Sequence, residues 1–228
     1  MSYANDFEQW SEAIHAVPLN EVKVPNRPVD EIVARTETLA VDAAEDREAL
    51  AGAGLDVSLI EQLTPLSGAL RYCQANWMSE YRARKEAQVQ WNEEAPQAFV
   101  LRDEILHHFS FAYRHRDDLL NKVMRIREGG SNADMIQDLI DAASLGEKNP
   151  EPLVAINFNL ETLTVARTVS HRMSELLAAA NGASDESSEI KVLRDKAFTL
   201  LDRVDSTIRE YGRYVFWKDA EKRERYKL

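Results

Sequence analysis

The sequence contains a single cysteine, Cys73, among its 228 residues. One thiol cannot form a disulfide within the chain or build a cysteine-based metal site, and it fits a reducing compartment. Long apolar runs are also missing, because no stretch approaches the roughly 18 consecutive apolar residues of a membrane-spanning helix. Residues 1–6 lack the basic start and the apolar stretch of a signal peptide. We therefore expect a soluble, cytoplasmic protein with no membrane partner.

Positive charge is scarce as well. The chain has 28 Lys and Arg against 39 Asp and Glu, so its formal net charge is -11 and its pI is about 5.0. Proteins bind nucleic acid largely through Lys and Arg side chains that displace counterions from phosphates. Nucleic acid is therefore not expected as the main partner. The C-terminal residues 218–227 are locally basic, and we interpret this charge as complementing the dipole at a helix C-terminus.

Proline and glycine are few, and their positions predict where helices begin and end. The chain has 7 prolines and 8 glycines, and residues 97–149 contain no proline. Proline removes a backbone donor and glycine favours helix ends, so long helices are permitted between them. Apolar residues recur at steps of three and four in these intervals. The predicted helices cover approximately residues 6–17, 29–52, 56–91, 97–127, 132–146, 157–180 and 184–225.

These helices predict the fold class. Alternating strand patterns are absent, and helices of about 30 residues reach roughly 45 Å, so their natural neighbours are one another. We expect an all-α protein, an antiparallel up-and-down bundle of about four long helices with two shorter accessory helices. Residues 1–228 should form a single bundle domain, with a short helix and an extended linker in residues 1–28 packing on it. A similarity between residues 115–120 and 171–177 leaves a duplication of helical hairpins open.

Glutamate and histidine at helical spacing suggest a metal-binding bundle. Glu104 precedes His107 by three positions, which places both side chains on one face, as di-iron bundles require. Glu12 and His15 repeat the spacing, but on a short helix that Pro18 ends. A ferritin-like site also needs glutamates from two further helices. The alternative to a metal site is that the Glu and His spacing arises by chance in an acidic chain.

A second combination uses histidines alone. His108 and His115 are seven residues apart and therefore on one side of the predicted helix, and His171 could face them from a neighbouring helix. Three imidazoles could bind zinc or nickel. The candidate metal ligands are thus Glu104, His108, His115 and His171, and the alternative is that these are surface or half-buried side chains.

Residues 102–107 resemble the loose arginine-to-histidine pattern of HEPN-type helical ribonucleases and toxins. The resemblance implies that Arg102 would stabilise a phosphate and His107 would move a proton. The intervening Asp103 and Glu104 argue against an RNA backbone at this position.

Arg102 and Arg116 also lie near the middle of the apolar face of the predicted helix. Each is expected to bury its stem or to pair with an acid on a neighbouring helix, and the functional alternative is a clamp for a carboxylate or phosphate.

The segment 210–219, followed by Tyr226, resembles the end of a group of uncharacterised bacterial all-helical proteins of similar length, and this implies a helical fold without an assigned activity. Gly212 inside a helix costs about 1 kcal/mol relative to alanine, so we expect a neighbouring helix or an aromatic ring to approach it closely. Either the N-terminal segment with Phe7 and Trp10 wraps this helix end, or the end forms a subunit interface. The candidate interface residues are Tyr211, Tyr214, Phe216 and Trp217.

Sequence motifs for nucleotide binding or for serine hydrolases are absent. Cys73 lies on a core stripe and is expected to be a buried small hydrophobe. We therefore expect no cofactor and predict a non-enzymatic helical-bundle protein that acts through protein contacts, as a homo-oligomer or a member of a complex. A metal-binding enzyme and a HEPN-like ribonuclease remain the alternatives.

Overall fold

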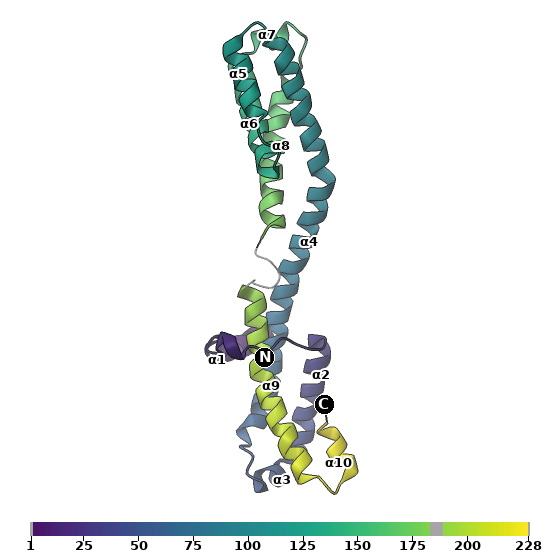
Figure 1. Ribbon diagram of the computed structural model, residues 1–228. Helices are drawn as coiled ribbons and strands as arrows, with labels where there is room; N and C mark the ends of the chain where they lie inside the picture. Colours follow the sequence, from purple (N-terminus) through teal and green to yellow (C-terminus); the bar gives the residue numbers. More distant parts are fainter. Residues whose placement is uncertain (1, 183–188, 228) are drawn as a thin grey trace. The chain divides into compact units, whose positions relative to one another are not determined.

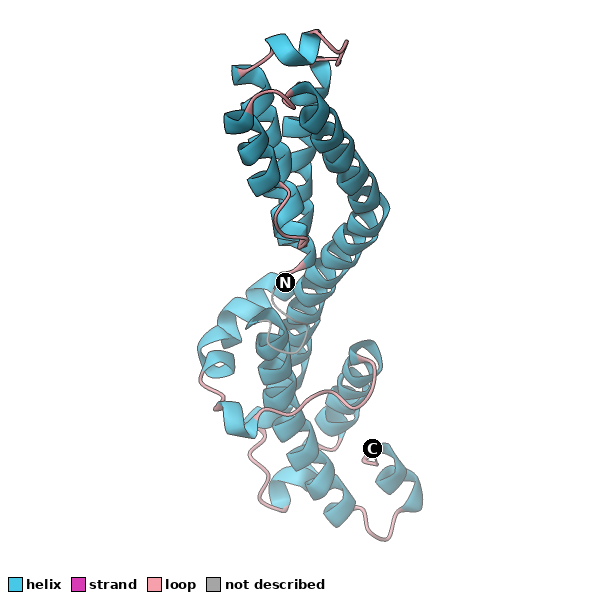
Figure 2. Ribbon diagram, turned by 45° about the horizontal axis from the view of Figure 1, so that its top comes forward, coloured by secondary structure: helices cyan, strands magenta, loops and turns pink. Residues whose placement is uncertain are grey.

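The computed structural model describes residues 2–182 and 189–227, and all regular elements in this part of the chain are helices (Figure 2). This confirms the predicted all-α class. No helix within these ranges is both long and apolar enough to cross a membrane. The helices are α1 (Tyr3–His15), η1 (Leu19–Glu21), α2 (Val29–Glu45), α3 (Arg47–Gly52), α4 (Ser58–Ala112), α5 (Asp117–Ile126), α6 (Asn132–Lys148), α7 (Glu151–Val154), α8 (Glu161–Ala180), α9 (Glu189–Val215) and α10 (Ala220–Arg225).

The helices pack into two compact units. Unit 1 comprises the described residues up to Tyr81 together with those from residue 189 onward, and unit 2 comprises Arg82–Gly182. The helix α4 contributes residues to both units. The sequence predicts one bundle over residues 1–228, whereas the contacts fall into these two groups, each with its own apolar core.

Unit 1 buries apolar side chains of α2, α4 and α9 against one another. Their spacing at three and four positions turns one face of each helix inward. The innermost members, all nearly inaccessible to solvent, include Val33, Leu39, Leu63, Leu66, Leu70, Leu201 and Ile208.

Residues 16–28, which we call the strap, join α1 to α2 by crossing α9 (Figure 1). The backbone N–H of Lys23 donates to Thr199 Oγ1 at 2.8 Å. At the end of α1, just before the strap, Lys196 Nζ of α9 donates to the carbonyl of His15 at 2.8 Å. These two hydrogen bonds hold the strap and the end of α1 to α9.

The C-terminal tail packs on α9 in unit 1 through Tyr226. The ring of Tyr226 lies directly on Gly212, where an added Cβ would lie 2.6 Å from ring Cε1. This confirms the expected close approach of an aromatic ring. Tyr226 is fully buried, its hydroxyl donates to Asp46 Oδ2 at 3.0 Å, and Phe216 stacks on its ring with centroids 5.6 Å apart. Burial raises the pKa of Tyr226 far above its ordinary value, and the carboxylate of Asp46 raises it further.

In unit 2, α6 and α8 pack side by side in opposite directions (Figure 1). Ser170 Oγ donates to the carbonyl of Ile136 at 2.7 Å, whereas Arg167, earlier in α8, donates to Glu147 at 2.8 Å, later in α6. This reversed order shows that the two helices are antiparallel.

The helix α6 begins with a capping box and ends beside a close helix contact. Ser131 Oγ accepts from the backbone N–H of Asp134 at 3.1 Å, and the Asp134 carboxylate accepts from the Ser131 N–H at 2.9 Å. At Gly146, an added Cβ would lie 2.7 Å from Phe109 Cζ and 2.9 Å from Leu163 Cδ1. The small residue lets α4 and α8 approach the end of α6.

The prediction that a helix ends before Pro96 is wrong, because α4 continues through Pro65 and Pro96. A proline inside a helix costs about 3 kcal/mol through a lost hydrogen bond and a steric clash. Pro96 itself is exposed, but Ala95 and Ala98 on either side are buried in the core of unit 2. Packing of the flanking residues outweighs the local cost. Since α4 merges two predicted helices, the antiparallel four-helix arrangement stays a prediction.

The single helix expected over residues 97–127 is also wrong. The helix α4 ends at Ala112, and Arg116 has a non-helical backbone with φ -128 and ψ 86. Asp117 and Asp118 then occupy the first turn of α5, where negative side chains are favoured. The paired acids are a helix-start signal that apolar periodicity alone does not show.

The predicted helix over residues 184–225 is interrupted in a similar way. Residues 184–188 lie outside the described part of the chain. The helix α9 ends at Val215, and Asp219 then accepts from the backbone N–H of Lys222 at 3.0 Å as the N-cap of α10. The cap starts a new helix and turns the tail back toward Asp46.

Candidate functional site

Arg102 lies on α4 and is 8% exposed. Its Nε donates to Asp138 Oδ2 of α6 at 2.7 Å, and its other two nitrogens donate to Asp103 at 3.2 Å and to the carbonyls of Arg127 and Gly129 at 3.3 and 3.4 Å. This confirms the expected pairing with an acid on a neighbouring helix. Burial raises the pKa of Asp138, and the guanidinium of Arg102 opposes that rise.

Arg102 and His107 do not form a joint site. Arg102 is buried and each of its guanidinium nitrogens donates to a protein oxygen, whereas His107 is exposed beside His108, with ring centroids 5.9 Å apart. The ribonuclease hypothesis stays a prediction that gains no support from this geometry.

The candidate metal ligands are also separated. Glu104, His108, His115 and His171 are exposed, and His171 lies 3.4 Å from Glu175 of its own helix. His108 and His115 were expected on one helix, but α4 ends between them. Across residues 2–182 and 189–227, no group of three or more His, Cys, Asp or Glu side chains could hold a metal ion.

Arg116 does not occupy the apolar face that the sequence predicts for it. It precedes α5 and pairs with Asp118, with both bonds at 2.9 Å, and both side chains are more than half exposed. The expectation was wrong because the helix that would have carried Arg116 inward ends at Ala112.

The four aromatic residues proposed for an interface divide into two pairs. Phe216 stacks on Tyr226 and Tyr211 is half-buried, so both contribute to the core of unit 1. Tyr214 is 72% exposed and Trp217 is 65% exposed, and these two remain available for a contact.

The N-terminal helix α1 packs elsewhere. Phe7 stacks on Tyr72 of α4, with ring centroids 5.0 Å apart. The neighbouring Cys73 is buried, and burial raises the pKa of its thiol to about 12. This confirms that Cys73 is a buried small hydrophobe. Phe7 packs on α4, and the residue that covers Gly212 is Tyr226 of the C-terminal tail.

A cavity with a volume of about 610 Å³ lies within unit 1, between the strap, α2 and α9. This is within the range of roughly 300–1,000 Å³ that is typical of small-molecule sites. One part of its lining is apolar and comprises Val24, Ile32, Phe198 and Leu201. The remaining lining residues are Lys23, Asn26, Arg27, Arg35, Thr36, Asp202, Asp205, Ser206 and Arg209.

A buried polar network forms the base of the cavity. Asp205 Oδ1 accepts from Thr36 Oγ1 at 2.9 Å, and Asp205 Oδ2 accepts from Arg209 Nε at 2.6 Å. Arg209 also donates to the carbonyl of Lys227 at 2.8 Å. These bonds join α2, α9 and the C-terminal tail, so this side of the cavity is fixed without a ligand.

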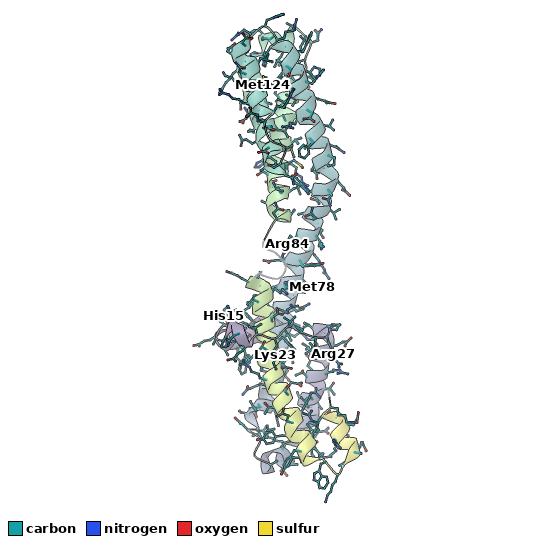
Figure 3. The ribbon with its side chains drawn as sticks, in the orientation of Figure 1. His15, Lys23, Arg27, Met78, Arg84 and Met124 are labelled. Carbon is teal, nitrogen blue, oxygen red and sulfur yellow. The ribbon has the colours of Figure 1, made fainter. Side chains whose placement is uncertain are left out.

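The rim of the cavity carries polar side chains that are paired with each other and polar side chains that have no partner. Lys23 Nζ donates to Asp202 Oδ2 at 2.7 Å and so closes one side. Figure 3 shows Lys23 and Arg27, which the strap contributes to the region of α9 and α2. Within the described residues, the side chains of Arg27, Arg35 and Ser206 have no hydrogen-bond or ion-pair partner. Their polar atoms are therefore available to a bound molecule.

No protein-family model matches this chain, and no curated protein or solved structure matches it. The resemblance carried by residues 210–219 stays a prediction, and function is argued from the cavity.

Sequence reasoning did not select this cavity, although two signals for it were present. Thr36 is a polar residue within the apolar stripe of α2, and Asp205 and Arg209 stand four residues apart on the inward face of α9. Polar residues at core positions of two helices indicate that the helices share a buried polar network. The sequence does not show that the strap closes over them.

Proposed function

We propose that this protein is a non-enzymatic binding protein that holds a small organic molecule in the cavity of unit 1. The observation that carries the proposal is the combination of an apolar wall and unpartnered polar groups in a cavity of about 610 Å³. Ligand sites typically combine apolar burial with a few polar groups that fix orientation.

The chemistry of the lining supports binding rather than proton transfer. Both carboxylates accept hydrogen bonds from cations, Asp202 from Lys23 and Asp205 from Arg209. Neither histidine nor cysteine is among the described residues that line the cavity. Arginine, which stays protonated, supplies the remaining charge.

A tryptophan placed in the cavity tests this proposal. Ser206 is half-buried and lines the cavity from α9, so an indole at this position would occupy the ligand space in Ser206→Trp. Glu210→Trp adds the same side chain at an exposed position of α9 that does not line the cavity. Ligand-observed NMR with aromatic fragments should show hits for the native protein and for Glu210→Trp, and these hits should disappear in Ser206→Trp.

Circular dichroism and thermal melts of both variants separate a filled cavity from an unfolded protein. Fragments that bind Ser206→Trp as well as they bind the native protein would place their site elsewhere. A library without any hit on the native protein would refute the proposal.

A second candidate function is self-association, which the exposure of Tyr214 and Trp217 favours. The two aromatic residues are followed by the locally basic residues 218–227, while the chain as a whole carries a net charge of -11. A second copy therefore offers acidic surface to this end of the molecule. Aromatic residues are enriched at protein interfaces.

Light scattering coupled to size-exclusion chromatography tests self-association. The mass should exceed that of the 25.9 kDa monomer and return to it in a Tyr214→Ser, Trp217→Ser variant. A strictly monomeric native protein would remove this second candidate and would leave the cavity proposal unaffected.

A further inference from the structure

We infer that the ligand of the cavity is an organic anion, a phosphate monoester or a carboxylate on an apolar body, and that Arg27 and Arg35 bind its charge. This inference rests on the proposed function of the cavity. It names the class of molecule that the lining selects.

The lining has an excess of positive charge. Lys23 is neutralised by Asp202, and Arg209 is neutralised by Asp205. Arg27 and Arg35, which also line the cavity, have no acidic partner in the described part of the chain. Two uncompensated guanidinium groups thus face one cavity in a protein whose net charge is -11. A ligand with one or two negative charges would neutralise them.

The acids of the cavity are already engaged. Asp205 Oδ1 accepts from Thr36 at 2.9 Å and from Arg209 at 3.3 Å, and Asp205 Oδ2 accepts from Arg209 at 2.6 Å. Asp202 Oδ2 accepts from Lys23 at 2.7 Å. An incoming anion therefore meets carboxylates whose charge is balanced by their own cations, which reduces the repulsion that it would otherwise experience.

The backbones that carry the two arginines are restricted before binding. Arg27 directly precedes Pro28, and the residue before a proline is confined to extended conformations. Arg35 lies in the middle of α2, one residue before Thr36, which is fixed by Asp205. Restricting a binding group in advance lowers the entropy lost on association. Guanidinium groups also match the paired oxygens of carboxylates and phosphates.

The apolar wall determines the rest of the ligand. Val24 on the strap and Ile32 on α2 face the cavity together with Phe198 and Leu201 of α9. An aromatic ring offers Phe198 a favourable ring contact and buries its surface against the aliphatic side chains. An anion without an apolar body would leave this wall exposed to water, so inorganic phosphate should bind more weakly than an aryl phosphate.

Three probes that differ chiefly in charge test the inference: 2-naphthol, 2-naphthoate and 2-naphthyl phosphate, with inorganic phosphate as the probe without an apolar body. Titration of the native protein, followed by fluorescence or calorimetry, should rank the affinities as phosphate ester, then carboxylate, then alcohol. We expect about a tenfold gain for each added charge, the size of one charge-assisted hydrogen bond. Binding of the two anions should weaken as salt is raised, since both arginines are exposed.

Arg27→Gln and Arg35→Gln should each lower the affinity for 2-naphthyl phosphate about tenfold, with the affinity for 2-naphthol unchanged. Arg223→Gln is the matched control, because Arg223 is an exposed arginine of unit 1 whose guanidinium has no partner in the described residues and does not line the cavity. Its affinities should equal those of the native protein. Arg35→Lys keeps the positive charge but loses the planar guanidinium group that can donate two parallel hydrogen bonds, so it should give an intermediate affinity.

The outcomes separate this inference from the proposed function. Equal affinity for all three naphthyl probes, with binding still lost in Ser206→Trp, would overturn the anion specificity and keep the cavity as a binding site. Anion binding that is insensitive to both arginine variants would also overturn the inference. Absence of binding by every probe would count against the cavity function itself.

Discussion

The contact between Gly212 and Tyr226 allows a sharp prediction of stability. In Gly212→Ala, the new methyl group would overlap the tyrosine ring, with Cε1 only 2.6 Å away. The helix backbone cannot yield, because Ile208 and Arg209 on the preceding turn are buried. The ring must therefore leave its site, and the hydroxyl must release Asp46.

The magnitude follows from two opposing contributions. Removing a fully buried aromatic side chain from a core costs about 3–5 kcal/mol. Alanine returns about 1 kcal/mol relative to glycine in a helix. Gly212→Ala should therefore lower the free energy of unfolding by about 2–4 kcal/mol, as measured by urea unfolding followed by circular dichroism.

A matched substitution separates the steric effect from helix propensity. Gly52 lies in α3 with no heavy atom within 4 Å of an added Cβ, so Gly52→Ala should be neutral or slightly stabilising. Tyr226→Ala removes the clash, and adding Gly212→Ala to that variant should then cost nothing. The reasoning is refuted if Gly212→Ala destabilises the Tyr226→Ala protein as much as it destabilises the native protein.

Three further predictions concern other sites. Arg102→Met leaves Asp138 buried without its cation and should lower the free energy of unfolding in urea by about 3–5 kcal/mol. The loss should be larger at pH 8 than at pH 4.5, because a protonated Asp138 needs no cation. A loss of stability that does not depend on pH would contradict this. Ser131→Ala removes the cap of α6 and should cost about 1 kcal/mol, whereas an unchanged unfolding midpoint would show that water replaces the cap. Burial raises the pKa of Cys73 from 9.0 to about 12, so the native thiol should not react with Ellman's reagent at pH 8 and should react after denaturation. Since the folded state keeps a proton that the unfolded state releases, this thiol should also make stability fall as pH rises above about 9, by up to about 1.4 kcal/mol per pH unit, and a flat alkaline stability profile would contradict that assignment.

Local rules were sufficient where one segment decides the outcome. Pro18 follows α1 closely and α3 ends at Gly52, as the sequence predicts. Each of these features depends on backbone donors, capping atoms or conformational freedom within a few residues. Gly212 also signalled a close contact, although only the structure shows that the ring comes from Tyr226.

Rules that consider only neighbouring residues failed where contacts between distant segments determine the structure. Pro96 lies inside a helix because Ala95 and Ala98 are buried against residues that are far away in the sequence. The division into two units is likewise a property of contacts between the first and last parts of the chain. Apolar spacing predicts which face of a helix is buried, but it does not identify the helix that covers that face.

The cavity shows the same limit. Its lining comes from residues 23–36 and residues 198–209, which are brought together only by folding. Arg27 in an extended linker and Arg35 on a helix surface resemble ordinary solvated side chains in the sequence. Their common position becomes evident only when the strap is seen to cross α9.

The order of the chain in the two units also has a consequence for biosynthesis. Unit 2 is one continuous segment, Arg82–Gly182, inserted between the two parts of unit 1. All of its helices leave the ribosome before α9, whose residues complete the core of unit 1. Domains generally fold as units during synthesis, so unit 2 should be folded on the ribosome while α1, the strap and α2 still expose the apolar faces that α9 will cover. Synthesis of α9 thus determines when the N-terminal part of the chain becomes stable, and a ribosome that stalls before or within this helix would present an aggregation-prone nascent chain.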